Sequence, residues 1–501
     1  MKAKLWMVVV VVMLVAPGLV QARGIRWAQL NSADVLDSLK ISRTATVTVA
    51  ASNSSALAIV QSDYQCDGTA DEVQINAALI KAALTGGSVF LFGGTYTLTA
   101  TVDLQSNVTL TGEKGATIVA TNIIAYYVLE AAGKSNLTVE NITIDADSLN
   151  YSSVFCNTCT DVTIKNVYFK SVGTTTGVGI YLAATDRATI TECTFSFGFR
   201  GFYITVGSDI RISNNTFDEV RNCVTVATTT DRMIVSGNSM VFTGSVDPVN
   251  RLVDLADANY CVVSNNIMVN SRLSGGGDAI YSNSGGKCHS IIGNLIYGCP
   301  DVGIDIQSDH TLIAFNQVID SGYSAIGLAG ASYCNIIGNT VVNAKVNVAA
   351  YGYGITTGDR SGVSCTNNMI IGNMVTDNQD SSTTLYGFYD MNSGASDNTY
   401  IANFADSMGT ANFSLQGTNL IATDNKNHIT QNSGVVSVAN GGKIAHGLAD
   451  TASAYIAIPT VAFHMVAITA VDGDSMTVSL ADSVGVAITT PENVSWWAEV
   501  R

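Results

Sequence analysis

Short apolar segments recur along most of this chain, and they share one pattern of hydrophobic and polar positions. Ile-Ile-Gly-Asn occurs three times, at 291–294, 336–339 and 370–373. Looser copies end in Asn or Cys: Ile190–Cys193, Ile212–Asn215, Val235–Asn238, Val263–Asn266, Ile313–Asn316 and, one residue short, Ile401–Asn403. Apolar residues alternate within each copy and β-branched residues are common, so the pattern predicts short strands and not helices.

The spacing of these copies predicts how the strands are arranged. From Asn215 onward the copies follow one another at intervals of 22 to 34 residues. A period of this size with variable insertions is typical of a solenoid whose core strands are constant and whose loops are not. Stacked coils lie about 4.8 Å apart, so a corner residue meets its own copy in the next coil.

Asn is well suited to an inward corner of such a solenoid. It tolerates left-handed backbone angles, and its amide donates to one neighbour and accepts from the other. The preceding Gly helps the tight bend. We therefore interpret Ile-Ile-Gly-Asn as a structural corner that is repeated once per coil, and not as a binding motif.

A second strand in each coil reads apolar–x–apolar. Because side chains alternate across a strand, the middle residues share the outer face. They predict one column: Tyr181, Tyr203, Thr225, Asp254, Tyr281, Asp305 and Gly327, with Arg251, Asp278, Asn283 and Gln307 around it. Aromatic rings stack on the apolar faces of sugars, while acids and amides bind hydroxyl groups. The column is therefore a candidate carbohydrate-binding face, although any solenoid also has solvated polar faces of this kind.

The acidic residues of the column are candidates for catalysis, and Asp278 is the third of them beside Asp254 and Asp305. Asp254 and Asp305 lie two coils apart, which predicts a separation of about 9–10 Å. This is near the upper separation for the acid and base of an inverting glycosidase. A lyase would instead need a base and a cation that holds a substrate carboxylate, and Arg251 is the nearby candidate.

The segment before the repeats has helical spacing. Thr69–Glu72 reads as a capping box, and Gly86-Gly87 ends the pattern. Val73, Ala77, Ile80 and Leu84 form an apolar stripe between them. We expect a capping helix over 69–85 that covers the open end of the solenoid, where a terminal coil would expose core. Residues 23–62 are an N-terminal extension with one strand in Arg43–Ser52.

These features together resemble a known family. The Asn ladder, the stretch CDGTADEVQINAAL and the following GGTY resemble the right-handed parallel β-helix of the pectate lyase superfamily, as found in tail spikes and polysaccharide depolymerases. The resemblance covers residues 63–427 and implies an all-β solenoid. It transfers no activity, because the sequence lacks the Asn-Thr-Asp, Asp-Asp, Gly-His-Gly and Arg-Ile-Lys sets of polygalacturonases and the Arg-x-Pro-x-x-Arg stretch of pectate lyases.

The pattern changes in residues 428–501, where apolar and polar residues alternate cleanly. Asn440-Gly441 and Asp472-Gly473 predict hairpin turns. We expect a small antiparallel β-sandwich, and its His-Gly-Leu and Trp-x-Ala-Glu-Val segments resemble C-terminal β-modules of phage tail fibres.

Composition and charge narrow the class of partner. Only 13% of residues are charged, against roughly 25% in an average protein, and 47% are hydrophobic, which argues against disorder. The net charge of −16 disfavours nucleic acid and anionic membranes, and it favours neutral sugars or acidic sugars bridged by Ca²⁺.

The N-terminus predicts export. Lys2 and Lys4 precede the apolar run Leu5–Val20, and small residues allow cleavage after Ala22, so residues 1–22 read as a signal peptide. The alternative is a membrane anchor. An exported protein is secreted or lies on a cell or virion surface, and no membrane contact is expected after cleavage.

Cysteines and metal-ligating residues give weaker signals. Cys156 and Cys159 are the most plausible local disulfide, whereas Cys193, Cys261 and Cys334 read as small buried residues. No His spacing indicates a metal site, and no cofactor is expected. Asp145, Asp147 and Asn150 are candidate Ca²⁺ ligands, and so are Asp472 and Asp474. The preference of turns for Asp and Asn explains these residues equally well.

Three functions remain open. The first is an extracellular carbohydrate-recognition β-helix of the tail-spike or surface-adhesin type, whose partner is a polysaccharide or cell-surface glycan. The second is a secreted polysaccharide depolymerase, either a hydrolase or a lyase, so the chain is not assigned as an enzyme or a non-enzyme. The third is a structural surface solenoid. Because tail-spike-like β-helices are often trimers, the resemblance also allows a homotrimer.

Overall fold

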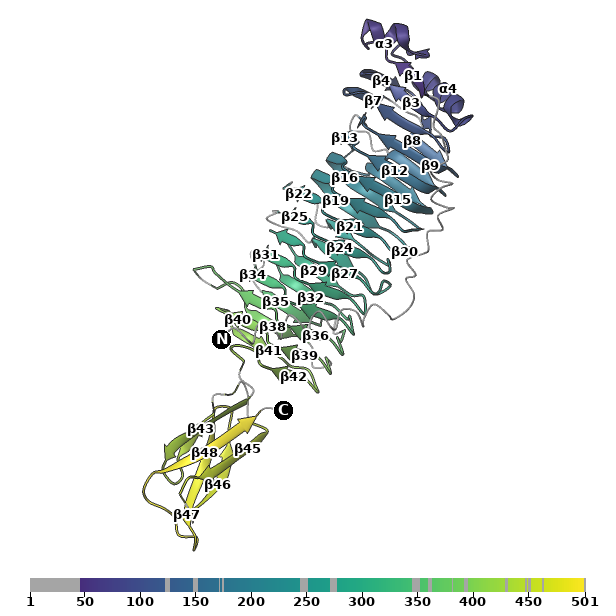
Figure 1. Cartoon of the computed structure of the whole chain (residues 1–501). Helices are drawn as coiled ribbons and strands as arrows, with labels where there is room; N and C mark the ends of the chain where they lie inside the picture. Colours follow the sequence, from purple (N-terminus) through teal and green to yellow (C-terminus); the bar gives the residue numbers. More distant parts are fainter. Residues whose placement is uncertain are drawn as a thin grey trace, which may run out of the picture.

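The computed structural model describes residues 46–499 except 122–126, 147–151, 171, 174, 244–250, 271–276, 345–351, 359–362, 381, 392–394, 429–430, 447, 449–451 and 462–463. The predicted signal peptide and most of the N-terminal extension lie outside the described residues. The described chain forms a long solenoid, and a small β-module lies beyond the C-terminal end of the solenoid (Figure 1).

The solenoid is a right-handed parallel β-helix, as predicted. In the described residues an 18-stranded sheet takes one strand from most coils, such as β24 (Val262–Ser264), β27 (Ser290–Ile292), β30 (Leu312–Ala314) and β33 (Asn335–Ile337). A 24-stranded sheet takes two strands from most coils, such as β25 (Ile267–Asn270) and β26 (Ile280–Ser282). Corresponding residues are paired directly, so Ile291 faces Ile313 and Ile313 faces Ile336. The repeat therefore stacks like on like.

The predicted corner is an asparagine ladder, made of Asn215, Asn238, Asn266, Asn294, Asn316, Asn339, Asn373, Asn403 and Asn425, all buried. The amide nitrogen and backbone nitrogen of each residue both donate to the side-chain oxygen of the next one. For Asn266 the two bonds to Asn294 Oδ1 are 2.9 and 3.1 Å. The left-handed backbone angle falls on the preceding residue, with φ of 66° at Gly293 and 63° at Gly338, and not on the ladder Asn as we expected.

Stacked apolar side chains fill the inside of the solenoid. Phe169, Phe195 and Phe217 of successive coils stack with ring centroids 4.6 and 4.8 Å apart. The cysteines predicted as small buried residues do belong to this core, and Cys193, Cys261 and Cys334 are at most 1% exposed. The predicted disulfide is wrong in this structure, where Cys156 and Cys159 are free thiols.

Helix α4 (Glu72–Ala83) forms within the predicted range and lies at the N-terminal end of the solenoid, near helix α3 (Ala56–Gln61) and strand β1 (Thr46–Ala50) (Figure 1). The predicted capping box is wrong. The helix begins after Asp71, whose carboxylate accepts from the backbone of Gly68 and Thr97 and makes no cap bond.

The predicted buried stripe of α4 is also wrong. The helix buries Ile75, Ala78, Leu79 and Ala82 in the solenoid core, whereas Val73, Ile80 and Leu84 are more than half exposed. Both stripes have helical spacing and lie on nearly opposite sides of the helix. Contact with β1 and with β3 (Ser88–Leu91) selects the stripe that contains more small residues, which let the helix approach the sheet.

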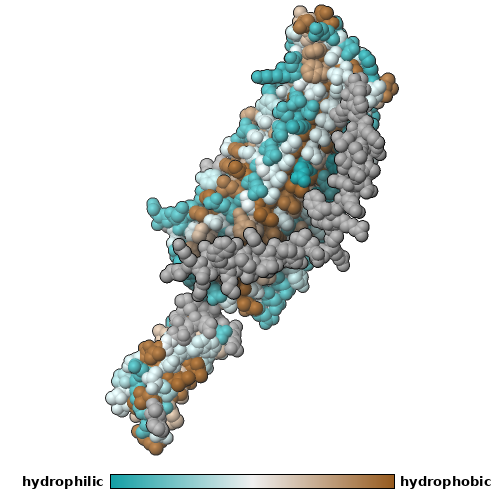
Figure 2. Space-filling model, viewed as in Figure 1, coloured by the Kyte–Doolittle hydropathy of each residue, from teal (hydrophilic) through white to brown (hydrophobic). Residues whose placement is uncertain are grey.

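The C-terminal module is the predicted antiparallel sandwich. One sheet holds β43 (Gln431–Val438), β48 (Glu492–Glu499) and β45 (Ala454–Pro459), and the other holds β44 (Lys443–Ala445), β47 (Ser475–Asp482) and β46 (His464–Val471). Asp472-Gly473 closes the β46–β47 hairpin. The Asn440-Gly441 hairpin is wrong, because this turn connects strands of different sheets. The module exposes apolar side chains, including those of Ile456, Ile458 and Met465 (Figure 2).

Candidate functional site

The predicted column forms as expected on the 24-stranded sheet. Its strands are β14 (Val178–Ala183), β16 (Thr194–Ile204), β19 (Thr216–Val226), β23 (Val253–Asp254), β26, β29 (Val302–Ile306) and β32 (Ser324–Leu328). Direct strand pairs run through Tyr181, Tyr203, Thr225, Asp254, Tyr281, Asp305 and Gly327. We call these seven residues the outer column. The side chains of its tyrosines and aspartates are partly exposed.

A second column runs beside the first, three residues earlier in each coil. We call Arg200, Asn222, Arg251 and Asp278 the flanking column. Arg200 faces Asn222 in the strand register, and the Arg251 backbone nitrogen donates to Asn222 Oδ1 at 2.9 Å. Two consecutive buried residues, Gly201 and Phe202, separate the columns in β16. At Gly201 a Cβ would lie 2.6 Å from the Cys223 carbonyl oxygen, so glycine is what allows this close approach.

Arg251 joins residues from both columns into one charged cluster. Its Nη1 lies 3.1 Å from Asp254 Oδ2, and its Nε lies 3.4 Å from Asp278 Oδ2. Its guanidinium carbon lies 3.4 Å from the centroid of the Tyr281 ring. We call Arg251, Asp254, Asp278, Tyr281 and the neighbouring Asp305 the Arg251 cluster. The structure thus brings together five of the predicted site residues from three successive coils.

Burial raises the pKa of both acids that Arg251 contacts. Burial raises the pKa of Asp278 well above its ordinary value, and the carboxylates of Asp305 and Asp301 add to the effect against the opposing charge of Arg251. Burial also raises the pKa of Asp254, although Arg251 and a backbone hydrogen bond from Ala256 oppose it. Asp278 is therefore the acid of this cluster most disposed to hold a proton, while Asp254 has the closer contact with Arg251.

Four predicted residues lie outside the cluster. Tyr181 and Tyr203 are separated from Asp254 by the Thr225 coil, and their rings lie 5.1 Å apart. Phe155, which the sequence did not single out, extends this aromatic stack at 4.9 Å from Tyr181. Asn283 Oδ1 accepts from the Gly285 backbone within its own turn. Gln307 is partly buried just after β29 and has no side-chain hydrogen bond to a described residue.

The sequence reasoning missed Arg200. Its guanidinium carbon lies 4.4 Å from the Phe199 ring centroid and 4.8 Å from that of Tyr203. A signal for it exists in the sequence, because Arg200 precedes Tyr203 by three residues, as Arg251 precedes Asp254 and Asp278 precedes Tyr281. This spacing identifies the flanking column once it is known that two buried residues separate the columns in β16.

A tyrosine cluster lies further along the solenoid, and the sequence pattern includes only one of its members, Tyr389. Tyr353 of β35 (Tyr353–Thr357) and Tyr386 and Tyr389 of β38 (Tyr386–Asp390) stack on one another. The ring centroids lie 4.8 Å apart for Tyr353 and Tyr389 and 4.5 Å apart for Tyr386 and Tyr389. The apolar–x–apolar pattern of the sequence includes Phe388-Tyr389-Asp390, and direct strand pairs join Gly327 to Tyr389 through Thr356.

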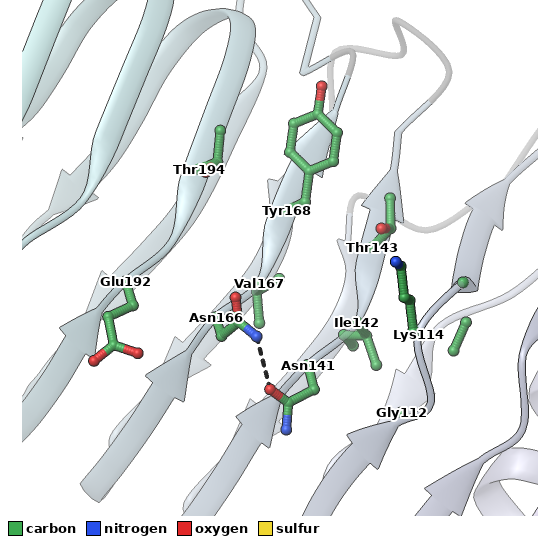
Figure 3. Close-up of a pocket in the computed structure, with 12 residues that line it drawn as sticks. Gly112, Lys114, Asn141, Ile142, Thr143, Asn166, Val167, Tyr168, Glu192 and Thr194 are labelled. Carbon is green, nitrogen blue, oxygen red and sulfur yellow. Dashed lines mark hydrogen bonds between the residues drawn. The ribbon is translucent and has the colours of Figure 1, made fainter.

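A separate pocket of about 480 Å³ lies nearer the N-terminal end of the solenoid, where β6 (Thr109–Gly112) and β9 (Ser135–Glu140) lead into β7 (Ala116–Ala120) and β10 (Thr143–Asp145) (Figure 3). Six residues lie between Leu110 and Thr117 but only three between their partners Val139 and Thr143, so the corner of the earlier coil is enlarged. The lining is mostly polar and includes Lys114, Asn141, Asn166, Tyr168 and Glu192. The Asn166 amide donates to Asn141 Oδ1 at 2.8 Å. This pocket shares no residue with the Arg251 cluster, and no predicted site residue lines it.

The described residues contain no group of three or more His, Cys, Asp or Glu that is placed to hold a metal ion. Two of the candidate Ca²⁺ ligands form ion pairs instead: Asp145 with Lys170 at 2.8 Å and Asp472 with Lys443 at 2.6 Å. Asp147 and Asn150 lie outside the described residues.

Within the part of the chain that the structure describes, no helix has the length and apolar character needed to cross a membrane.

Comparisons with known proteins agree with the fold. A family model described as right handed beta helix region matches residues 106–246 and 152–275. No curated protein matches the sequence. The tailspike gp61 of Pseudomonas phage phi297 is similar in structure, with a TM-score of 0.51 at 10% identity, over 85% of this chain and 92% of that chain.

An enzyme has a similar degree of structural likeness. The DFA-IIIase of Arthrobacter chlorophenolicus A6 without its lid has a TM-score of 0.51 at 14% identity, over 75% of this chain and 98% of that chain. At these identities the likeness shows the shared β-helix fold alone.

Proposed function

We propose that this protein binds a polysaccharide along the outer and flanking columns. The observation that carries the proposal is one continuous face on which partly exposed tyrosines alternate with carboxylates, an amide and guanidinium groups. Tyrosine rings offer apolar surface for the faces of sugar rings, and their hydroxyl groups stay available for hydrogen bonds. The Arg251 cluster supplies fixed charges and hydrogen-bond acceptors in the middle of this face.

The solenoid geometry suits a polymeric ligand. Neighbouring members of the outer column are about 4.8 Å apart, a spacing comparable to the length of a sugar residue. Aromatic residues lie on both sides of the Arg251 cluster, with Phe155, Tyr181 and Tyr203 on one side and Tyr386 and Tyr389 on the other. A chain that follows the solenoid axis would meet rings before and after the charged residues. The tailspike with the same fold supports a role of this kind at a virion or cell surface.

Cleavage of the bound glycan is a second candidate function, favoured by the unequal environments of the acids. Asp278 has a pKa raised well above its ordinary value, as a general acid requires, while Asp254 and Asp305 are partly exposed carboxylates. Pairs of acids whose environments separate their pKa values commonly divide the acid and base roles in glycoside hydrolysis. A lyase is less well supported, because the cation expected to hold a substrate carboxylate, Arg251, is already engaged by two aspartates.

A screen of polysaccharides separates these functions. The purified mature chain is run in affinity gels that contain plant or bacterial polysaccharides, with and without Ca²⁺, and the polymers are assayed for new reducing ends and unsaturated products. Retention without product supports recognition, reducing ends alone support a hydrolase, and unsaturated products support a lyase. Neither retention nor product on any polymer would contradict the proposal and leave a structural solenoid.

Substitutions locate the site in any such activity. Asp254→Asn, Asp278→Asn and Asp305→Asn should abolish cleavage and leave the fold intact, and the first and third should leave binding largely unchanged. The matched control is Asp218→Asn, an exposed acid on β19 outside both columns. Cleavage that persists in all three variants would rule out this cluster as the catalytic centre.

We also propose export to the cell or virion surface, and we retain the homotrimer as a prediction that light scattering of the purified chain tests.

A further inference from the structure

One guanidinium beside the proposed site has no acidic partner among the described residues. Arg200 lies near the end of β16, partly buried, with its guanidinium over the rings of Phe199 and Tyr203. Its Nε is buried and has no hydrogen-bond partner in the described structure. Burial lowers the pKa of this guanidinium, and the nearby charge of Asp254 opposes that effect without an ion pair.

Three other described arginines of the solenoid have acidic partners. Arg187 and Asp161 approach to 2.7 Å, as do Arg232 and Asp209, and Arg251 contacts two carboxylates. A desolvated donor without a partner is costly, and natural proteins contain few of them. Arg200 therefore needs an explanation that local structure within the described residues does not supply.

The way Arg200 is held suits a ligand in the plane of its guanidinium. Stacking on aromatic rings uses the faces of the guanidinium and leaves the N–H donors around its edge unused. These donors match the two oxygens of a carboxylate. Arg200 also belongs to the flanking column, next to Asn222 and beside Tyr203 of the outer column. A sugar on Tyr203 would therefore lie next to the unused donors.

We propose that Arg200 selects a glycan that carries a carboxylate on the sugar bound beside Tyr203. This inference rests on the proposed function and names the substrate class for that same face. It differs from the expectation from net charge, which favoured neutral sugars or acidic sugars bridged by Ca²⁺. A desolvated cation in contact with the ligand is screened much less than the more distant charges of the acidic surface. Arg200 would provide two charge-assisted hydrogen bonds, whereas Arg251 remains tied to Asp254 and Asp278.

Matched polymers test this directly. The purified mature chain is measured for binding to polygalacturonate and to alginate, each beside its carboxyl-reduced form, and to a pyruvylated polysaccharide beside its depyruvylated form. The first two pairs detect a uronate carboxylate, and the third detects a pyruvate ketal. We expect binding at least about tenfold stronger for the carboxylated member of one pair, since hydrogen bonds to charged groups are of that strength.

Variants assign the preference to Arg200. Arg200→Gln should bind both members of the preferred pair alike, at the level the wild type shows for the neutral form, and Arg200→Lys should keep part of the preference. Arg232→Gln, at a paired surface arginine on the other sheet, should keep all of it. Melting curves establish that each variant is folded.

The outcomes separate the two proposals. A wild type that binds both members of every pair equally, or an Arg200→Gln variant that keeps the preference, would overturn the role of Arg200 and leave polysaccharide binding in place. A wild type that binds no polymer of the wider screen would instead overturn the proposed function, and this inference with it.

Discussion

One coil repeat has opposite consequences at the ladder corner and at the outer column. At the ladder corner each coil from Asn215 to Asn425 supplies the same residue, and each buried amide is satisfied by its copy in the next coil. On the outer column an aromatic ring, a small hydroxyl side chain and a carboxylate follow one another at Tyr203, Thr225 and Asp254. Identity between coils thus marks a position that stabilises the fold, while variation marks a position that is free to bind.

The physical reason for this difference is burial. An interior polar group must be paired within the protein, and stacked identical amides pair themselves. An outer residue is solvated whatever its type, so the fold places little demand on it. Where outer residues nevertheless form a network, as in the Arg251 cluster, the burial of Asp278 is not required by the repeat. This is why we assign function there. The following predictions test this contrast, from the largest expected effect to the smallest.

Asn294→Ala should have the largest effect on stability. It removes the oxygen that accepts from the backbone N–H of Asn266 and from one N–H of the Asn266 amide, so two buried N–H donors lose their acceptor, while the other amide N–H still donates to the Val235 carbonyl. Two unsatisfied buried donors cost about 3 kcal/mol or more of unfolding free energy. Urea unfolding measures the loss. The control is Asn265→Gly at the neighbouring left-handed position, which Gly293 occupies in the next coil and which should be nearly neutral. An equal cost for both variants would contradict the role of the ladder.

Asp390 is an interior exception to the neutral ladder and should make stability depend on pH. Burial raises its pKa to about 6, while the Tyr400 hydroxyl donates to its carboxylate at 2.5 Å. Because the folded-state pKa lies above the unfolded value of 3.8, folding favours the protonated acid. The contribution to stability is full below about pH 4, falls as pH rises toward about 6 and stays lost above it, by about 3 kcal/mol in total.

Asp390→Asn should flatten this pH dependence, because the amide cannot ionise. Melting temperatures between pH 4 and pH 8 compare the two proteins under otherwise equal conditions. The surface variant Asp218→Asn should keep the wild-type profile. If the Asp390→Asn profile falls with pH as steeply as that of the wild type, Asp390 is not the titrating group.

Tyr203→Ala should weaken glycan binding with little change in stability. Loss of one aromatic contact corresponds to about 1 kcal/mol, or roughly fivefold in Kd, and Arg200 also loses one of its two supporting rings. Affinity gels with the retained polysaccharide give the measurement. Tyr260→Ala, at an exposed tyrosine on a corner outside both columns, should bind as the wild type does. Equal losses in the two variants would remove the distinction between the outer column and any other exposed aromatic residue.

Asp209→Asn should have the smallest effect. Asp209 and Arg232 pair at 2.7 Å, but their side chains are 46% and 55% exposed. Exposed ion pairs contribute about 0–1 kcal/mol and are screened by salt. Asn also tolerates the left-handed angle of 57° at this position. Unfolding in low and high salt should show a small difference that disappears with salt. A loss as large as that of Asn294→Ala would break the link between burial and the energetic cost of losing a partner.

The outer column could be predicted residue by residue, while the flanking column could not. Alternation along a strand is local, so Ile280-Tyr281-Ser282 places Tyr281 outside without knowledge of other coils. Two consecutive buried residues, Gly201 and Phe202, interrupt the alternation, so Arg200 joins Tyr203 across three residues instead of two. Because Gly201 packs closely against the carbonyl of the next coil, this interruption is a property of the stack and not of the strand.

Helix α4 shows the same limit. Its position follows from local spacing and from the glycines that end it, but two apolar stripes were available. Only contact with the solenoid core decides that Ile75 and Leu79 are buried while Ile80 and Leu84 are exposed.

The sequence by itself determined the repeat, the strands and the asparagine corner, because each depends on residue types within one coil. The tertiary structure decided which charges meet and what they can do. Arg251 and Asp278 are 27 residues apart in the chain, and their contact exists because coils stack in register. Burial and the charges of neighbouring coils then raise the pKa of Asp278. The same stacking buries Arg200 Nε at a place where no described residue accepts a hydrogen bond from it. These effects depend on distance and desolvation, which a one-dimensional pattern does not contain.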